Sequence, residues 1–117
     1  MSRWYIPDGY IPPASTGAEV SHESICVLND TPDAVMFTLT AFFADRDPER
    51  SEPITLPGHR AVHLRTADPA QVGGLRLIPG VPYGLVIESD ANLHLQYSRL
   101  DTTQPAYTLM TAVPPRG

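Results

Sequence analysis

The chain has 117 residues, with thirteen acidic and eight basic side chains and a formal net charge of −5 at pH 7. All eight basic residues are arginines, and scattered arginines on an acidic chain lack the clustered positive charge of a non-specific nucleic-acid binder. The length predicts one domain over residues 1–117, and the absence of a long apolar run or a signal-peptide pattern predicts a cytoplasmic protein.

Aromatic residues and prolines are mixed near the N-terminus, in Trp4 to Pro13. The prolines exclude a helix and predict at best a broken edge strand that lies across the body of the protein. Trp4, Tyr5 and Tyr10 either cover one open end of a β core or form a stacking surface for a sugar or a base. The packing role is favoured, because aromatic side chains are chiefly packing residues.

Two strands are predicted next, over Glu19–Asn29 and Ala34–Ala44, with the turn Asn29 to Asp33 between them. The second of these strands alternates well and is expected to be the longest, and a charged hairpin tip at Glu49 to Pro53 follows it. His22 and Glu23 are neighbours on a strand, so their side chains point to opposite faces and cannot act as an acid–base couple. The single cysteine, Cys26, lies in an apolar run that is typical of a small buried side chain.

Shorter strands are predicted at Ile54–Leu56, His59–Arg65 and Leu75–Ile78, with a polar connection over residues 66–74. The spacing of His59 and His63 suits zinc only on a helix, where the two side chains lie one turn apart. On a strand they stand about 13 Å apart at ~3.3 Å per residue, so the sequence predicts no metal site.

The segment from Val81 to Asp101 contains an apolar run, Gly84–Glu88, and an alternating run, Leu93–Tyr97. These two runs predict strands, and the turn-forming residues between them favour an antiparallel hairpin. On the second strand His94 and Gln96 are expected to face outward. A last strand is predicted over Ala106–Val113, followed by a short tail, residues 114–117.

Seven or eight short strands, thirteen prolines and no amphipathic helix predict an all-β protein, an antiparallel β-sandwich, with a small barrel as the alternative. The chain contains neither a Gly-x-Ser-x-Gly nucleophile signature nor a glycine-rich phosphate loop. We therefore predict no catalytic residues and no cofactor.

A group of charged residues falls at strand ends or on one strand face. They either form salt bridges that pin loops or subunits, or line a pocket for an anionic or hydroxylated ligand. The residues are Asp45, Arg46, Asp47, Arg60, Arg65, Arg99 and Asp101.

Several short segments, in order, are similar to the sensory rhodopsin transducer family. They are Gly9-Tyr10-Ile11-Pro12-Pro13, Ser21-His22-Glu23, Cys26-Val27-Leu28-Asn29, Asp45-Arg46-Asp47-Pro48, Arg60 with His63, and Arg99-Leu100-Asp101. The resemblance implies a non-enzymatic β-sandwich that assembles as a homotetramer and relays a signal from the cytoplasmic face of a membrane receptor. It also implies candidate binding residues: Tyr10, His22, Glu23, Asp45, Arg46, Arg60, His63, Arg99 and Asp101.

Three functions follow as hypotheses from these observations. The first is an oligomeric signal transducer or adaptor that recognises another protein. The second is a small-molecule binding module for a sugar-like ligand, and the third, ranked last because the chain has no lysine, is a DNA-binding regulator.

Overall fold

The computed structural model describes all 117 residues, which form nine strands and no helix. The strands are β1 (Ser2–Gly9), β2 (His22–Asn29), β3 (Val35–Phe42), β4 (Glu49–Arg50), β5 (Ile54–Leu56), β6 (Arg60–Arg65), β7 (Tyr83–Ser89), β8 (His94–Asp101) and β9 (Thr108–Ala112). The chain accordingly contains no helix long and apolar enough to cross a membrane.

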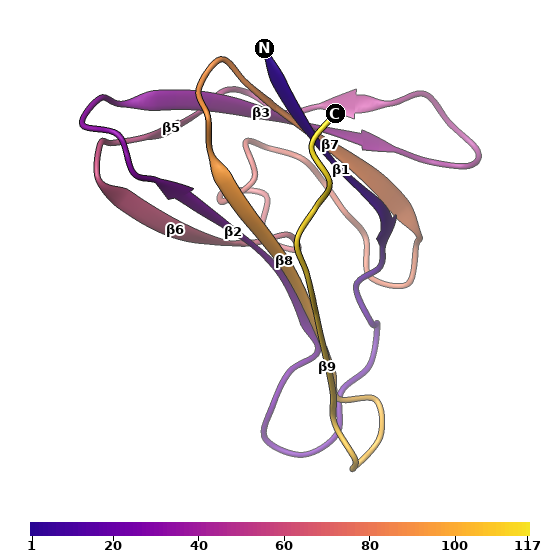
Figure 1. The fold of residues 1–117 in the computed structure, drawn as a ribbon. Coiled ribbons are helices and arrows are strands. Elements are labelled where there is room, and N and C mark those ends of the chain that lie inside the picture. Colours follow the sequence, from indigo (N-terminus) through magenta and orange to yellow (C-terminus); the bar gives the residue numbers. More distant parts are fainter.

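The strands form two antiparallel sheets. Sheet A has the order β1-β7-β3-β4, with β5 also paired to β3, and sheet B has the order β6-β2-β8-β9. The sheets stack on one another, and the far ends of β8 and β9 project beyond the stack (Figure 1). The predicted antiparallel β-sandwich is confirmed.

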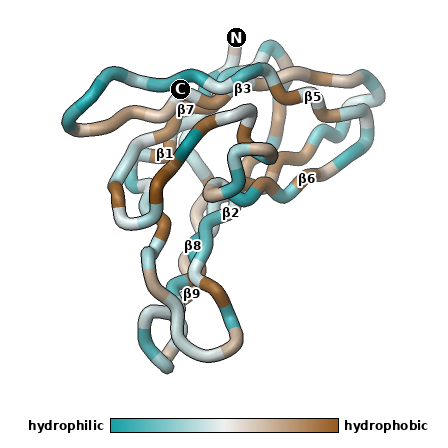
Figure 2. Tube along the Cα trace, turned by 180° about the vertical axis from the view of Figure 1, so that it is seen from behind, coloured by the Kyte–Doolittle hydropathy of each residue, from teal (hydrophilic) through white to brown (hydrophobic).

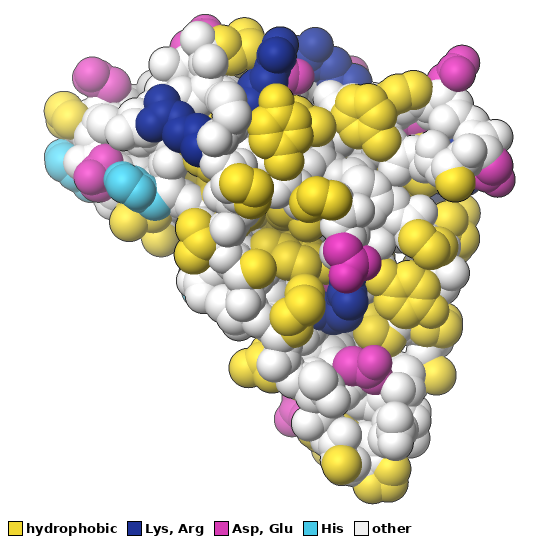
Figure 3. Space-filling view, turned by 45° about the vertical axis from the view of Figure 1, so that its right-hand side comes forward, with side chains coloured by type: hydrophobic (Ala, Val, Ile, Leu, Met, Phe, Trp, Pro, Cys, Tyr) yellow, Lys and Arg dark blue, Asp and Glu magenta, His cyan; other side chains and the backbone are white.

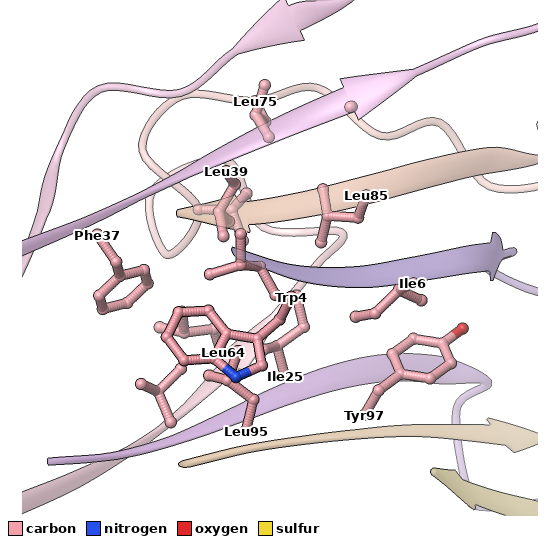
Figure 4. Packing of buried hydrophobic residues seen from close by; sticks show 14 of the residues in the cluster. Trp4, Ile6, Ile25, Phe37, Leu39, Leu64, Leu75, Leu85, Leu95 and Tyr97 are labelled. Atoms are coloured by element: carbon pink, nitrogen blue, oxygen red, sulfur yellow. The ribbon is translucent and has the colours of Figure 1, made fainter. Parts of the chain in front are cut away.

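The core lies between the sheets and is supplied by every second residue of each long strand. Leu39 of β3 and Ile87 of β7 face Ile25 of β2 and Leu95 of β8, and all four are buried. Figure 4 shows such side chains meeting between the two layers, with the Trp4 indole among them. On β8 the intervening residues His94 and Gln96 are exposed, as predicted.

The N-terminal segment is an edge strand with a break in its pairing. β1 pairs with β7 from Ser2 to Ile6, and the register shifts before Gly9, where Pro7 interrupts the ladder. A Cβ atom on Gly9 would lie 2.4 Å from the Tyr83 ring, so the close approach requires glycine here. Trp4 is part of the core, which confirms the packing role for this aromatic residue.

The predicted hairpin between β7 and β8 is wrong. β7 pairs with β1 and β3 in sheet A, whereas β8 pairs with β2 and β9 in sheet B, so residues 90–93 cross from one sheet to the other. Each of these two strands buries one face. The buried faces can pack against each other across the stacked sheets without hydrogen bonds between β7 and β8. Ser89 helps to turn the chain, because its hydroxyl donates to the carbonyl of Met36 at 2.7 Å and accepts from the amide of Ala91 at 3.1 Å.

Three smaller predictions are also wrong. Leu75–Ile78 forms no strand: Leu75 and Leu77 are buried, but the segment joins no sheet, and glycines with positive φ precede and follow it. The predicted tip at Glu49 to Pro53 begins with β4, which pairs with β3. The strand predicted to be longest, β3, has 8 residues, as have β1, β2 and β8.

The C-terminal segment, residues 113–117, is more than a short tail. It leaves sheet B after β9 and crosses to β1 of sheet A (Figure 1). The amide of Tyr5 donates to the carbonyl of Pro115 at 3.1 Å, and the amide of Gly117 donates to the carbonyl of Arg3 at 2.9 Å. The tail therefore connects the two sheets beside the edge of β1.

Candidate functional site

Glu23 on β2 occupies an inward-facing position and is 0% exposed. It shares the face of the strand with Ile25 and Val27, two core residues. A carboxylate at such a position is costly unless hydrogen bonds and charge compensate it. Its surroundings therefore define the first candidate site.

Five donors surround the two oxygens of Glu23. Oε1 accepts from the hydroxyls of Tyr83 and Thr66, the latter at 3.1 Å. Oε2 accepts from the Tyr97 hydroxyl, from the backbone amide of Tyr10 at 2.7 Å and from Arg99 Nε at 3.5 Å. The donors come from both sheets and from the chain after β1, so one carboxylate holds several elements together.

Arg99 on β8 carries the positive charge of this cluster and is 16% exposed. Its Nη2 donates to the carbonyl of Asp8 at 2.9 Å and to the Tyr97 hydroxyl at 3.0 Å. The guanidinium carbon lies 5.8 Å from the centre of the Tyr10 ring, within cation–π distance. Arg99 thus separates the buried carboxylate from solvent.

The protonation states in the cluster follow from burial and charge. Burial raises the pKa of Tyr83, and the adjacent Glu23 charge raises it further. The pKa of Tyr97 is also raised, by burial and by its hydrogen bond to Glu23, although Arg99 opposes the shift. Burial alone would lower the pKa of Arg99, but Tyr97, Glu23 and Asp8 raise it, so the guanidinium stays charged.

This geometry suits a structural role for Glu23. A general base or metal ligand needs a lone pair directed at its substrate or ion, and the lone pairs of this carboxylate already accept bonds from protein donors. No three His, Cys, Asp or Glu side chains in the chain lie close enough to hold a metal ion. Of the candidates that the sequence predicted, the structure brings together Tyr10, Glu23 and Arg99.

The remaining predicted residues are dispersed. Arg46 lies in the β3–β4 loop, 3.7 Å from Glu49 Oε1 and over the ring of Phe43, and the adjacent Asp45 is in the same loop. Arg60 begins β6 and donates to the carbonyl of His59 at 3.0 Å. These contacts are local, so this part of the charged group holds a loop and a strand end and lines no pocket with Arg99.

His22 and Asp101 also make local contacts. His22 Nδ1 lies 2.8 Å from the carbonyl of Val20, on the face of β2 opposite Glu23. Asp101 Oδ1 accepts from the hydroxyl and the amide of Thr103 at 2.5 and 2.9 Å, and these bonds lower the pKa of its carboxyl group. Asp101 therefore shapes the turn that leads toward β9.

His63 belongs to a different place, a groove of about 760 Å³ on the outer face of sheet B. It stands opposite Cys26 in the β2–β6 ladder, and both side chains line the groove. The prediction that Cys26 is buried is wrong: it is half-buried on the outer face, because Ile25 and Val27 take the inward positions of β2. Partial burial raises the pKa of its thiol.

The sequence analysis missed the phenols of Tyr83 and Tyr97, the hydroxyl of Thr66, and Arg116 at the groove. The alternation of Glu23, Ile25 and Val27 places the carboxylate on the core face, and this pattern could have revealed a buried charge that needs donors. No local pattern indicates which hydroxyls would meet it, since Glu23 and Tyr97 are 74 residues apart.

The family model described as "Anabaena sensory rhodopsin transducer" matches residues 1–114 of this chain. The chain belongs to this family. The transducer family is not a known enzyme family, and no curated protein sequence matches the chain.

Two solved structures are similar to this chain over most of its length. The crystal structure of Thermotoga maritima 1070 has 33% sequence identity and a TM-score of 0.84, covering 97% of this chain and 91% of that one. The Anabaena sensory rhodopsin transducer has 30% identity and a TM-score of 0.71, covering 86% of this chain and 88% of that one.

The first prediction concerns the charge of Glu23. Glu23→Gln keeps the shape of the side chain but places an amide donor against other donors and leaves Arg99 without its buried partner. We expect the free energy of unfolding to fall by about 3–5 kcal/mol. Urea unfolding followed by tryptophan fluorescence measures the change.

The control is Glu19→Gln, which makes the same charge change at an exposed position. It should alter stability by less than about 0.5 kcal/mol. If Glu23→Gln were as stable as the parent protein, the carboxylate would not be a structural anchor.

The second prediction uses pH to test the Tyr83 hydroxyl. Its pKa in the folded protein is raised above the value of about 10 in the unfolded chain. The stability that this shift contributes is therefore fully present below pH 10 and is lost as the pH rises above it, by about 1.4 kcal/mol per pH unit. Tyr83→Phe should cost about 1.5–3 kcal/mol at pH 7, and this cost should shrink above pH 10.

Thr66→Val is the matched control for Tyr83→Phe. It removes a donor from the same oxygen of Glu23, but threonine does not ionise. Its cost should be the same at pH 7 and pH 11 in urea unfolding. A Tyr83→Phe cost that is equally independent of pH would contradict the assigned shift.

Proposed function

We propose that residues 1–117 form one transducer-type domain that acts as a non-enzymatic, cytoplasmic signalling adaptor. Membership of the transducer family supports this proposal, and the Anabaena relative is named as a sensory rhodopsin transducer. The bonding of Glu23 supports the non-enzymatic role. The oxygens of this buried carboxylate already accept bonds from protein donors, so the charge stabilises the fold. The adaptor recognises a receptor or another signalling protein and works as an oligomer.

The observation that carries the oligomer is the outer strand of sheet B. β9 pairs with β8 on one edge and with no strand on the other, and four of its five residues are exposed. Leu109 is 70% exposed there, and Tyr107 and Val113 flank the strand with exposed surface. Figure 2 shows this projection from behind, with hydrophobic stretches along an otherwise neutral or polar chain.

An unpaired edge with apolar side chains is a template for strand pairing. Two copies related by a twofold axis would pair β9 with β9 and bury Leu109 of both. A homotetramer in which every contact is twofold needs a second interface. Strand β3 offers one, because Met36 and Phe42 are exposed on the outer face of sheet A. The proposed homotetramer thus uses one surface on each sheet.

A second candidate function is small-molecule binding, most simply of a sugar-like ligand. The groove on sheet B favours it, since its volume is within the range of ligand sites. Trp4 is buried in the core and neither Tyr5 nor Tyr10 lines the groove, so the stacking surface suggested by the sequence would lie outside it. DNA binding ranks last, because three of the arginines already pair with carboxylates.

The third prediction tests the interface on β9. The parent protein should be a tetramer by light scattering at micromolar concentration, and Leu109→Arg should reduce it to dimers or monomers by placing charges in the apolar contact. Ile78→Arg makes the same change at an exposed residue of the connection between β6 and β7 and should leave the tetramer intact. A monomeric parent protein would refute the oligomer.

The fourth prediction tests the transducer role itself. The purified protein should sediment with vesicles that contain a microbial sensory rhodopsin and should remain in solution with rhodopsin-free vesicles of the same lipids. Specific protein contacts give such selectivity, whereas a net charge of −5 provides no general attraction to an anionic lipid surface. Equal sedimentation with both vesicle types would count against receptor recognition.

A further inference from the structure

The groove on sheet B lies where the C-terminal tail leaves the sheet. β9 pairs with β8 only from Tyr97 to Asp101, so the first residues of β8 have no strand on that side. Val113 and Pro114 of the departing tail line the groove together with His94 and Gln96 of β8. The groove therefore opens at the point where the tail leaves sheet B and crosses to sheet A.

Arg116 is fixed at this opening by neutral groups. Its Nη1 donates to Asn92 Oδ1 at 2.8 Å, and its Nη2 donates to the Ser2 hydroxyl at 2.6 Å. The guanidinium carbon lies 5.9 Å from the centre of the Trp4 indole. Arg3, Arg46 and Arg99 pair with carboxylates, but no carboxylate oxygen lies within 4.0 Å of Arg116.

The other residues of the groove extend this arrangement. His63, His94 and Gln96 contribute polar side chains, while Leu28, Val113 and Pro114 contribute apolar surface. No aspartate or glutamate lines the groove, although the chain has thirteen acidic residues. The nearest acidic contact is Asp30 Oδ2, 3.7 Å from His94 Nε2 and outside the lining. Figure 3 shows histidine and arginine side chains on one face of the molecule, with hydrophobic side chains nearby and an acidic side chain beside the histidines.

We propose that this groove binds a small organic oxyanion, a carboxylate or phosphate attached to a flat apolar body. Arg116 takes the oxyanion, because a guanidinium that is already oriented and carries no carboxylate binds such groups with little loss of freedom. The apolar surface accommodates the body, and His63 adds a polar contact at the far side. The inference rests on the second candidate function, ligand binding, and is independent of the transducer role.

The test is a titration of the full chain by calorimetry with benzoate and with phenyl phosphate. Benzamide and phenol are the neutral counterparts of similar shape, and a set of neutral monosaccharides tests the sugar-like ligand. We expect an anion to bind at least about tenfold more tightly than its neutral counterpart, a difference that one oriented charge pair supplies. The stronger of the two anions identifies the carboxylate or the phosphate as the preferred group.

Three variants locate the site. Arg116→Gln should weaken anion binding at least about tenfold. Arg76→Gln removes an exposed arginine outside the groove and should leave the affinity unchanged. His63→Gln, on a different strand from the tail, should also weaken binding, which keeps the assignment testable if Arg116→Gln loosens the tail.

The outcomes separate the two ideas. Neutral and anionic probes binding equally, or sugars binding while anions do not, would overturn the oxyanion inference and leave ligand binding standing. No binding of any probe would overturn both. Anion binding that neither Arg116→Gln nor His63→Gln changes would show that the groove is not the site.

Discussion

The buried carboxylate of Glu23 is the constraint on which the sandwich depends. A charge without solvent must be compensated completely, and here the compensation comes from four hydroxyl or amide donors and one guanidinium. Because Tyr83 belongs to sheet A and Tyr97 to sheet B, the separation of the layers is fixed at this point. The apolar core contributes most of the driving force for folding, but apolar contacts are non-directional and do not by themselves fix one alignment.

The sheet changes of the chain determine which surfaces stay free. Residues 90–93 cross from β7 to β8, and the tail crosses back from β9 to β1. The second crossing protects part of the β1 edge but leaves two surfaces without a partner. One is the outer edge of β9, and the other is the groove beside the start of β8. Both proposed binding surfaces are consequences of the same path of the chain.

The sequence indicated the faces of the strands better than their partners. The alternation in residues 93–97 correctly placed Leu95 and Tyr97 inside and His94 outside, because a period of two depends only on local geometry. The same pattern was compatible with a hairpin or with a crossing between sheets, and the hairpin prediction was wrong. Leu75 and Leu77 alternate in the same way without belonging to a sheet, since burial alone imposes the pattern on an extended chain.

The candidate site was predictable in part for a related reason. Tyr10, Glu23 and Arg99 were named from the sequence, but as separate members of a family pattern and without their contacts. The bonds among them join residues that are far apart in the chain, such as Glu23 and Arg99, 76 positions apart. Such contacts follow from the order of strands in the sheets, which local patterns do not encode.

The tail connects the two proposed surfaces physically. β9 ends at Ala112, and the next residues, Val113 and Pro114, already line the groove. A contact that orders β9 therefore also restricts the wall of the groove, and a ligand on Arg116 restricts the chain that leads back to β9. When binding at one surface restricts a segment that both surfaces share, it changes the binding affinity of the other surface. Binding at the other surface then changes the affinity of the first by the same factor. The proposed assembly surface and the proposed ligand site adjoin where β9 passes into the tail, so coupling between them would need no movement of the sandwich itself.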